Sequence, residues 1–326
     1  MQQTYLKHLS TAIVVVCSSI LVQAQVKLDP NLKAYETVPG VSGNLNSIGS
    51  DTLNNLMALW AEGFNKKYPN TKIQVEGKGS ATAPPALAAA TAQLAPMSRK
   101  MKNDEIAPFV VKFGYAPTEI AVAIDALAVF VNKNNPLNEL SLEDVDGIFS
   151  RGRLRGGKEI TSWGQLGLKN DFITAPLSMY GRNSASGTYG YFKEFALNKG
   201  DFKDTVKEQP GSSSVVQGVE NDRFSIGYSG IGYVTSGVKA LKLGLSSRWN
   251  GENFTPAYAN ALNGKYPLSR FLYVYINKDP KTPLDPLTRE FIAYILSKDG
   301  QEIVLKDGYY PLSAGIAQKE LVKIAK

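Results

Sequence analysis

The sequence predicts an α/β fold in two domains, each built on an open sheet. Three turns of similar composition, at 49–52, 79–82 and 186–188, each lie between a strand-like segment and a helix-like one. Two nearly apolar stretches, 120–132 and 270–277, are long enough to carry the chain from one domain to the other and back. With 326 residues, of which 43% are hydrophobic, the chain can fill two cores of ordinary size.

The first 24 residues differ from the rest and predict an export signal. Lys7 and His8 precede apolar runs at 12–17 and 20–22, which are too short to cross a bilayer as a stable helix. Residues 22–24 approximate the small-residue cleavage pattern, so we expect cleavage after Ala24 and a mature protein outside the cytoplasm. Lipidation at Cys17 stays open as an alternative, although the valines before it lack the small residue expected there.

Cleavage after Ala24 would remove the single cysteine and the single histidine of the sequence. The mature chain would then have no disulfide, no thiol nucleophile and no imidazole. A Ser-His-Asp triad and the usual zinc hydrolases are therefore excluded, and we expect neither a cofactor nor a bound metal.

The net charge of +7 falls to +6 when Lys7 leaves (7 − 1). This mild excess either favours the approach of an anionic ligand or serves solubility alone. Nucleic acid is not an expected partner, because the one basic cluster, at 151–158, lacks the interleaved aromatic residues of a single-strand binder.

In the first domain, the apolar spacing predicts strands at 45–48 and 72–76. Apolar residues repeat every three or four positions between Leu53 and Phe64, which predicts a helix that ends before Tyr68. A second helix is expected from Pro84 to Ala92, because proline fits the first turn. Residues 95–100 are expected to form a third polar turn, in which Arg99 lies on the solvated surface.

The stretch 120–132 predicts a buried strand that leaves the first domain, with Asp125 as a satisfied core carboxylate or a hinge residue; we favour the first. The second domain then holds a helix at 140–149 capped by Ser141, a strand at 177–180 and a helix at 191–197, with the Ser-Gly-Thr of 186–188 at its N-terminus. The serines at 212–214 are expected to cap another helix. The stretch 270–277 returns the chain, and helices near 288–296 and 300–305 complete the first domain.

The turn at 181–190 carries one permanent cation, Arg182, and the hydroxyl groups of Ser184, Ser186 and Thr188. A helix N-terminus presents unpaired backbone N–H groups and about half a positive charge, so the turn predicts an anion site. The alternative is that Ser186 only caps the helix. Because strand-to-helix turns gather at one edge of an open α/β sheet, we expect the other two turns to face the same ligand.

The segments that carry these turns resemble the phosphate-binding protein of bacterial ABC phosphate importers, over essentially the whole mature chain. They are 49–52, 60–64, 77–80, 96–101, 182–188 and 226–233, of which 182–188 is the most specific. The resemblance implies a two-lobed periplasmic-binding-protein fold of type II with two crossing hinge strands. Lobe I would comprise 25–127 with 271–326, and lobe II 128–270. The lobes would close over one inorganic phosphate, and a monomer would deliver it to the permease subunits of an ABC transporter.

The family's binding residues carry over by resemblance, with one departure. Where the best-known members have an aspartate that accepts the proton of phosphate, this sequence places Ser98. A carboxylate attracts a protonated oxygen and repels a bare one, which is the physical basis for preferring phosphate to sulfate. We hypothesise that Asp51 supplies this acceptor; the alternative is that it only caps its helix. The expected ligand-binding residues are Ser50, Asp51, Thr52, Ser80, Ala81, Thr82, Ser98, Arg182, Ser184, Ser186, Gly187 and Thr188.

Three other functions stay open at this point. The same fold would also suit sulfate or another oxyanion. An extracellular hydrolase of phosphate esters would use Ser186 or Thr188 as its nucleophile, but no histidine is left to activate it. The third is a structural or surface-adhesion protein with an incidental anion. We expect a binding protein and not an enzyme.

Overall fold

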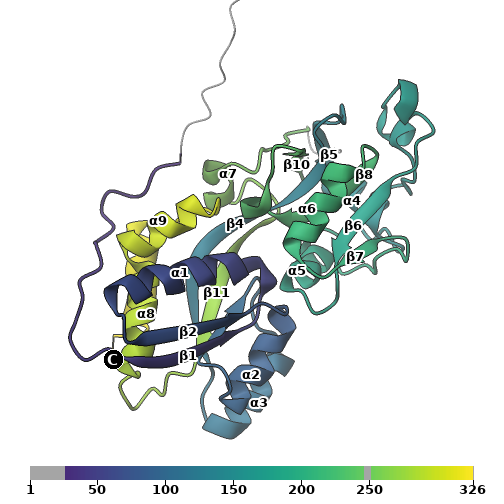
Figure 1. Ribbon diagram of the computed structural model, residues 1–326. Helices are drawn as coiled ribbons and strands as arrows, with labels where there is room; N and C mark the ends of the chain where they lie inside the picture. Colours follow the sequence, from purple (N-terminus) through teal and green to yellow (C-terminus); the bar gives the residue numbers. More distant parts are fainter. Residues whose placement is uncertain (1–25, 246–250, 326) are drawn as a thin grey trace, which may run out of the picture.

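The computed structural model describes residues 26–245 and 251–325, which form two lobes (Figure 1). The predicted signal peptide and Cys17 lie outside the described residues. Within the described residues, no helix combines the length and the hydropathy needed to cross a bilayer.

A mixed sheet of nine strands runs through both lobes in the order β2-β1-β3-β11-β4-β8-β6-β7, with β9 paired to β4. β1, β2 and β3 are parallel in lobe I, and β6, β7 and β8 are parallel in lobe II. The strands are β1 (Gly43–Ile48), β2 (Thr71–Glu76), β3 (Leu94–Met97), β4 (Thr118–Asn132), β5 (Glu139–Ser141), β6 (Ser178–Arg182), β7 (Lys207–Gln209), β8 (Ser225–Gly230), β9 (Val238–Ala240), β10 (Lys242–Gly244) and β11 (Ser269–Ile276).

The long strand β4 belongs to both lobes. It pairs antiparallel with β11 as far as Ala126, and with β8 from Leu127 onward. All of its residues from 120 to 132 are buried, as expected for a strand covered on both faces. The two crossing strands expected from the apolar stretches are therefore present, whereas the lobe boundaries at 127/128 and 270/271 stay predictions.

Helices cover both faces of the lobe I sheet (Figure 1), and the side chains of β11 pack against both layers. Leu272, Val274 and Ile276 pack in the core that includes α1, α8 and α9, whereas Tyr273 and Tyr275 pack with α2 and α3. Successive side chains of a strand point to opposite faces, so both faces must be apolar here. The helices are α1 (Asn54–Lys67), α2 (Ala83–Ala89), α3 (Asn103–Phe113), α4 (Leu142–Phe149), α5 (Gly187–Phe195), α6 (Ser212–Asn221), α7 (Tyr258–Leu262), α8 (Pro286–Leu296), α9 (Lys298–Lys306) and α10 (Ala314–Val322).

The helix predicted from the apolar spacing at 53–64 is α1, and its apolar stripe faces the core. Leu56, Met57, Trp60 and Phe64 are fully buried. The indole of Trp60 donates to the carbonyl of Gly300 over 2.9 Å, which joins α1 to α9. In lobe II, the Ser141 hydroxyl accepts from the backbone N–H of Asp144, so the predicted cap of α4 is confirmed.

Three local expectations are wrong. Residues 95–97 of the turn expected at 95–100 belong to the strand β3, and the chain bends only at 98–99. Arg99 is not solvated, because both of its terminal nitrogens donate to the carboxylate of Glu105 over 2.6 Å and its side chain is only 11% exposed. Gly211, and not a serine, occupies the N-cap of α6, so the serines at 212–214 lie inside the first turn.

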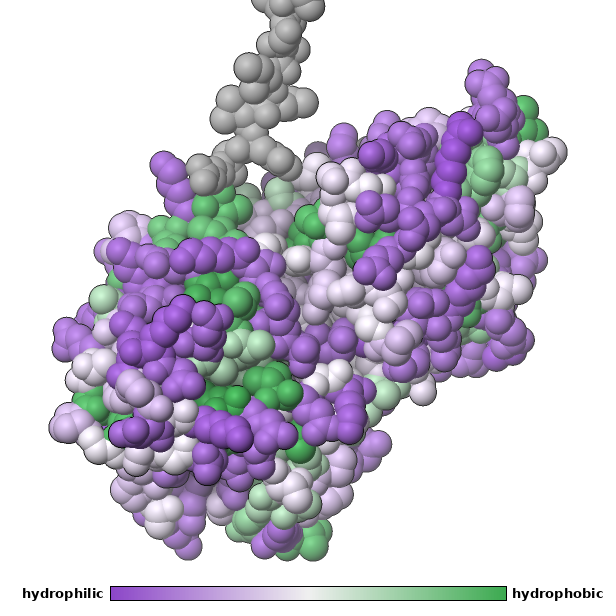
Figure 2. Space-filling model, viewed as in Figure 1, coloured by the Kyte–Doolittle hydropathy of each residue, from purple (hydrophilic) through white to green (hydrophobic). Residues whose placement is uncertain are grey.

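Hydrophilic residues cover most of the side of both lobes shown in Figure 2, with smaller hydrophobic areas on the lobe that carries α1. The most exposed large hydrophobic residues are spread over separate elements. Val111 lies in α3, Leu245 follows β10, and Val322 ends α10.

Candidate anion-binding site

The candidate site forms where the carboxyl ends of strands from both lobes meet. From lobe I come the turns after β1, β2 and β3, which carry Asp51, Ser80 and Ser98. From lobe II come Arg182, the last residue of β6, and the N-terminus of α5. Because parallel strands end at the same edge of a sheet, these turns are brought together although they lie far apart in the sequence.

The two lobes touch directly at this site. The hydroxyl oxygens of Thr52 and Thr188 lie 2.9 Å apart, and the N–H of Ala81 donates to the carbonyl of Ala185 over 3.1 Å. Gly187 packs so closely on lobe I that an added Cβ would lie 2.2 Å from the Ser80 hydroxyl oxygen and 2.6 Å from that of Ser98. The structure therefore has the lobes in a closed arrangement.

Arg182 is the buried cation of the site, with 1% of its surface exposed. Its Nη1 donates to the Ser212 hydroxyl over 2.6 Å and lies 3.0 Å from Oδ2 of Asp51, and its Nη2 donates to the carbonyl of Pro210 over 3.0 Å. Burial lowers the pKa of Arg182, and the Asp51 carboxylate opposes that shift. The Nε–H is buried and has no acceptor among the described residues, which is costly for a charged donor.

Asp51 faces the other lobe and not its own helix. Its Oδ2 accepts from both the N–H and the hydroxyl of Ser212, each over 2.9 Å, at the first turn of α6. The side-chain hydrogen bonds of Asp51 go to Ser212 of the other lobe and not to N–H groups of its own turn, whose N-cap is Ser50, so the alternative that Asp51 merely caps its own helix is wrong. The same carboxylate neutralises Arg182 while the lobes are closed.

The serines of lobe I form a compact pair of hydroxyl groups. The hydroxyl oxygens of Ser80 and Ser98 lie 3.3 Å apart, and the Ser80 oxygen accepts from the backbone N–H of Ser98 over 3.1 Å. Ser50 is also buried, and its N–H donates to the carbonyl of Pro96 over 2.8 Å. Across from them, Ser186 caps α5 by accepting from the N–H groups of Thr188 and Tyr189.

Three of the predicted residues are placed less favourably for a ligand. Ser184 is exposed and lines a groove of about 940 Å³ beside the site. The hydroxyl of Thr82 donates to the carbonyl of Gly79 over 2.8 Å, within its own turn. Ala81 is exposed and already uses its N–H on the other lobe.

The structure adds residues that the sequence did not single out. Ser212 bonds to both Arg182 and Asp51, and the hydroxyl of Tyr233 donates to the carbonyl of Asp51 over 3.0 Å. The signal for Ser212 was present, because 211–214 is a fourth glycine-serine turn between a strand and a helix. Tyr233 ends the segment 226–233, which carries part of the family resemblance, but no turn or helix-start pattern marks it as a residue of the site.

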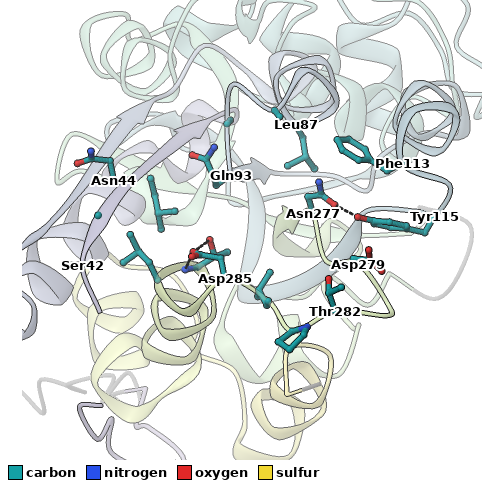
Figure 3. A pocket seen from close by; sticks show the side chains of 18 residues that line it. Ser42, Asn44, Leu87, Gln93, Phe113, Tyr115, Asn277, Asp279, Thr282 and Asp285 are labelled. Carbon is teal, nitrogen blue, oxygen red and sulfur yellow. Dashed lines mark hydrogen bonds between the residues drawn. The ribbon is translucent and has the colours of Figure 1, made fainter. Parts of the chain in front are cut away.

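A separate cavity of about 670 Å³ lies in lobe I at the opposite end of β1 (Figure 3). Leu45 and Leu87 line it together with polar groups such as Gln93, and Tyr115 donates to Asn277 across one side over 2.8 Å. The cavity contains none of the predicted ligand-binding residues.

Comparison with known proteins places this geometry in context. The model of the PBP superfamily domain matches residues 34–299. The phosphate-binding protein PstS of Pseudomonas aeruginosa is 52% identical over 322 residues, which is 98% of this chain and 99% of the relative. The protein SphX of Synechococcus elongatus is 32% identical, over 82% of this chain and 77% of the relative.

Two solved structures are similar as well, each at 25% identity. One is from Clostridium perfringens, described as a candidate phosphate ABC transporter substrate-binding protein with bound phosphate; its TM-score is 0.69, covering 83% of this chain and all of that one. The other is an ABC-type phosphate transport receptor from Vibrio cholerae, with a TM-score of 0.63, covering 82% of this chain and all of that one.

Proposed function

The chain belongs to the PBP superfamily and, within it, to the family of the phosphate-binding protein PstS; from this premise we propose that it binds inorganic phosphate between its two lobes and delivers it to the permease subunits of an ABC transporter. This family consists of binding proteins, and the chain is a binding protein and not an enzyme. Two relatives point to phosphate as the ligand: the PstS protein by its name and the Clostridium perfringens protein by its bound phosphate.

The observation that carries the proposal is the buried Nε–H of Arg182, which has no protein acceptor in the described part of the chain. An anionic oxygen placed against this edge of the guanidinium would accept from Nε and form a charge-assisted bond. α5 begins five residues further along the chain, at Gly187, and its N-terminus provides the positive end of the helix dipole. Both features stabilise a compact anion without any metal.

The hydroxyl groups of the site supply the remaining contacts for a tetrahedral anion. Ser80 and Ser98 approach from lobe I, while Thr188 approaches from lobe II. Since a ligand held this way contacts both lobes, it stabilises the closed arrangement more than an open one, and closure of this kind is a recognised switching mode of periplasmic binding proteins. We place the hinge at 127/128, where β4 leaves lobe I, and at 270/271, where β11 brings the chain back into it.

Asp51 provides the means to choose phosphate over sulfate. Its Oδ2 is occupied by Ser212 and Arg182, whereas its Oδ1 takes part in no hydrogen bond among the described residues. We assign Oδ1 as the acceptor of the phosphate proton. Sulfate has no proton to donate at neutral pH, so its bare oxygens would be repelled by this carboxylate.

The setting of the protein follows from the same proposal. A protein that feeds an importer must lie outside the cytoplasm, which agrees with the predicted signal peptide and cleavage after Ala24. We propose a periplasmic monomer, since the exposed large hydrophobic residues of 26–245 and 251–325 are scattered over separate elements and do not gather into one apolar interface there.

Isothermal titration tests the proposal directly. Phosphate should bind at one site per chain, sulfate should bind far more weakly, and small-angle scattering should show a more compact molecule with phosphate. The protein should also melt at a higher temperature in phosphate, because a ligand that binds only the folded state stabilises it. Tighter binding of sulfate than of phosphate would leave the fold assignment intact but would make sulfate the ligand. If neither anion binds, the proposal is refuted.

A further inference from the structure

A second buried arginine lies beside the site, on a crossing strand. Arg270 of β11 is 6% exposed, and it faces Asp125 of β4, its partner in the strand register. Its Nε and Nη2 donate to Oδ2 of Asp125 over 2.9 and 2.8 Å. Asp125 is fully buried, and its Oδ1 accepts from the N–H of Ile231 over 3.0 Å, which confirms it as a satisfied core carboxylate.

The guanidinium of Arg270 also reaches one residue of the anion site in each lobe. Its Nη1 donates to the carbonyl of Ser98 in lobe I over 2.8 Å. Its Nη2 donates to the hydroxyl oxygen of Thr188 in lobe II over 3.0 Å. The ring of Tyr191 covers its face at 5.2 Å, which fixes the plane of the group. One rigid fork, anchored by Asp125, therefore holds the two halves of the site at a fixed separation.

The bond to Thr188 also decides which way that hydroxyl points. An arginine can only donate, so the Thr188 oxygen accepts from Arg270 and keeps its own proton for another acceptor. The nearest such partner in the closed lobes is the hydroxyl oxygen of Thr52 at 2.9 Å, and an anion oxygen between the lobes would compete for the same proton. Arg270 thus turns Thr188 into a donor toward the ligand.

Stability alone is a poor reason for this arrangement. A buried ion pair is often no more stable than well-packed apolar side chains of the same volume, because desolvation offsets the attraction. Unlike apolar side chains, the ion pair supplies N–H groups that point in fixed directions. The neighbouring residues on which these groups act, Ser98 and Thr188, are both predicted ligand-binding residues.

We propose that Arg270, anchored by Asp125, is a positioning residue of the anion site: it joins Ser98 and Thr188 across the lobe boundary and orients the Thr188 hydroxyl as a donor. This inference rests on the proposed binding of phosphate. Encounter with the ligand takes place with the lobes apart, where one guanidinium cannot reach both partners. The contribution of Arg270 therefore belongs to the closed complex, and its loss should appear in the rate of release and not in the rate of association.

The test compares phosphate release from three variants with that from the wild-type protein, using radiolabelled phosphate and rapid filtration. The double variant Asp125→Leu with Arg270→Met removes the pair without leaving a buried charge unpaired. It should release phosphate about tenfold faster or more, with association changed by less than about threefold. Arg270→Lys keeps the charge but loses the fork, and release should be accelerated there too, to a smaller extent.

The matched control is Lys203→Met. Lys203 is another buried cation, but every bond of its Nζ to a described residue lies within lobe II, to the carbonyls of Gly147 and Ile160 and to Glu159. This variant should melt at a lower temperature and release phosphate at the wild-type rate.

Wild-type release from the double variant would overturn the assignment of Arg270, and so would equal acceleration in Lys203→Met, because the effect would then be a general loss of stability. Failure of the wild-type protein to bind phosphate would instead refute the proposed function on which the inference rests.

Discussion

Replacing Asp51 by asparagine tests the basis of anion selectivity. Asparagine keeps the size of the side chain and one acceptor oxygen, but it removes the negative charge and presents an NH₂ group in place of the second oxygen. In the structure that second oxygen, Oδ1, is the one that makes no hydrogen bond among the described residues, while Oδ2 serves Ser212. The variant therefore changes the group offered to the ligand more than the contact between the lobes.

The size of the effect follows from the bond that is lost. A hydrogen bond to a charged group contributes about 1.5–3 kcal/mol, so phosphate should bind about 10- to 150-fold more weakly to Asp51→Asn. Sulfate should bind more tightly than it does to the wild-type protein, since the carboxylate no longer repels it and the asparagine amide donates to it. The ratio of the two affinities should fall by more than either affinity changes alone.

Competition titrations of phosphate against sulfate at constant ionic strength measure this ratio. Asp104→Asn is the matched control, because Asp104 is an exposed carboxylate in the first turn of α3 and lies in the same lobe. Thermal unfolding without ligand shows how much of the change reflects the loss of a charge opposite Arg182. An unchanged preference for phosphate in Asp51→Asn would show that Asp51 is not the proton acceptor.

Three further predictions concern the cation, the contact between the lobes and pH. Arg182→Ala should weaken phosphate binding by more than about tenfold, and Arg182→Lys should recover only part of the lost affinity. Wild-type affinity of Arg182→Ala in a titration would show that phosphate does not bind at Arg182. Gly187→Ala should weaken phosphate binding by at least about tenfold, while the melting temperature without ligand stays unchanged. The reason is that the added Cβ would lie 2.2 Å from the Ser80 hydroxyl oxygen, and only when the lobes are closed. Wild-type affinity in this variant would show that closure does not need this close contact. Burial raises the pKa of Asp307 to about 6, so the folded state binds this proton more tightly than the unfolded state does. The resulting contribution to stability is present below about pH 4 and is lost as pH rises through about 6. Asp307→Asn should therefore stabilise the protein by about 1 kcal/mol at pH 7.5, allowing for partial exposure, and should have no effect on stability below pH 4. An equal gain in thermal stability at both pH values would contradict the assignment.

Much of lobe I was predictable because local patterns agree with the fold there. The stripe from Leu53 to Phe64 gives α1, and the two apolar stretches give β4 and β11. Strand β3 was missed because Pro96 and Ser98 are typical of turns. The carbonyl of Pro96 accepts from the N–H of Ser50, so the hydrogen-bonding groups of Pro96 face the side of the sheet where β1 lies. The pairing of β3 with β1 has already ended at Leu94. Proline has no N–H, but for this reason its absence removes no hydrogen bond between β3 and β11.

The site was predictable only as a set of separate turns. Glycine, serine and threonine next to helix starts marked Ser80, Ser186 and Thr188, because helix N-termini attract anions whatever their tertiary setting. The pairing of Asp51 with Ser212, and of Asp125 with Arg270, depends on strand register and on how the lobes meet. Neither is encoded within a window of ten residues, so spacing alone could not reveal them.

Because β4 is shared by both lobes, neither half can be cut out as an independently folding fragment. Deleting lobe II would expose the edge of β4 from Leu127 onward and its apolar residues to water, and lobe I is itself assembled from the two ends of the chain. Denaturant should therefore melt the protein in one cooperative step. The two halves contain buried indoles at Trp60 and Trp163, whose fluorescence would then change together.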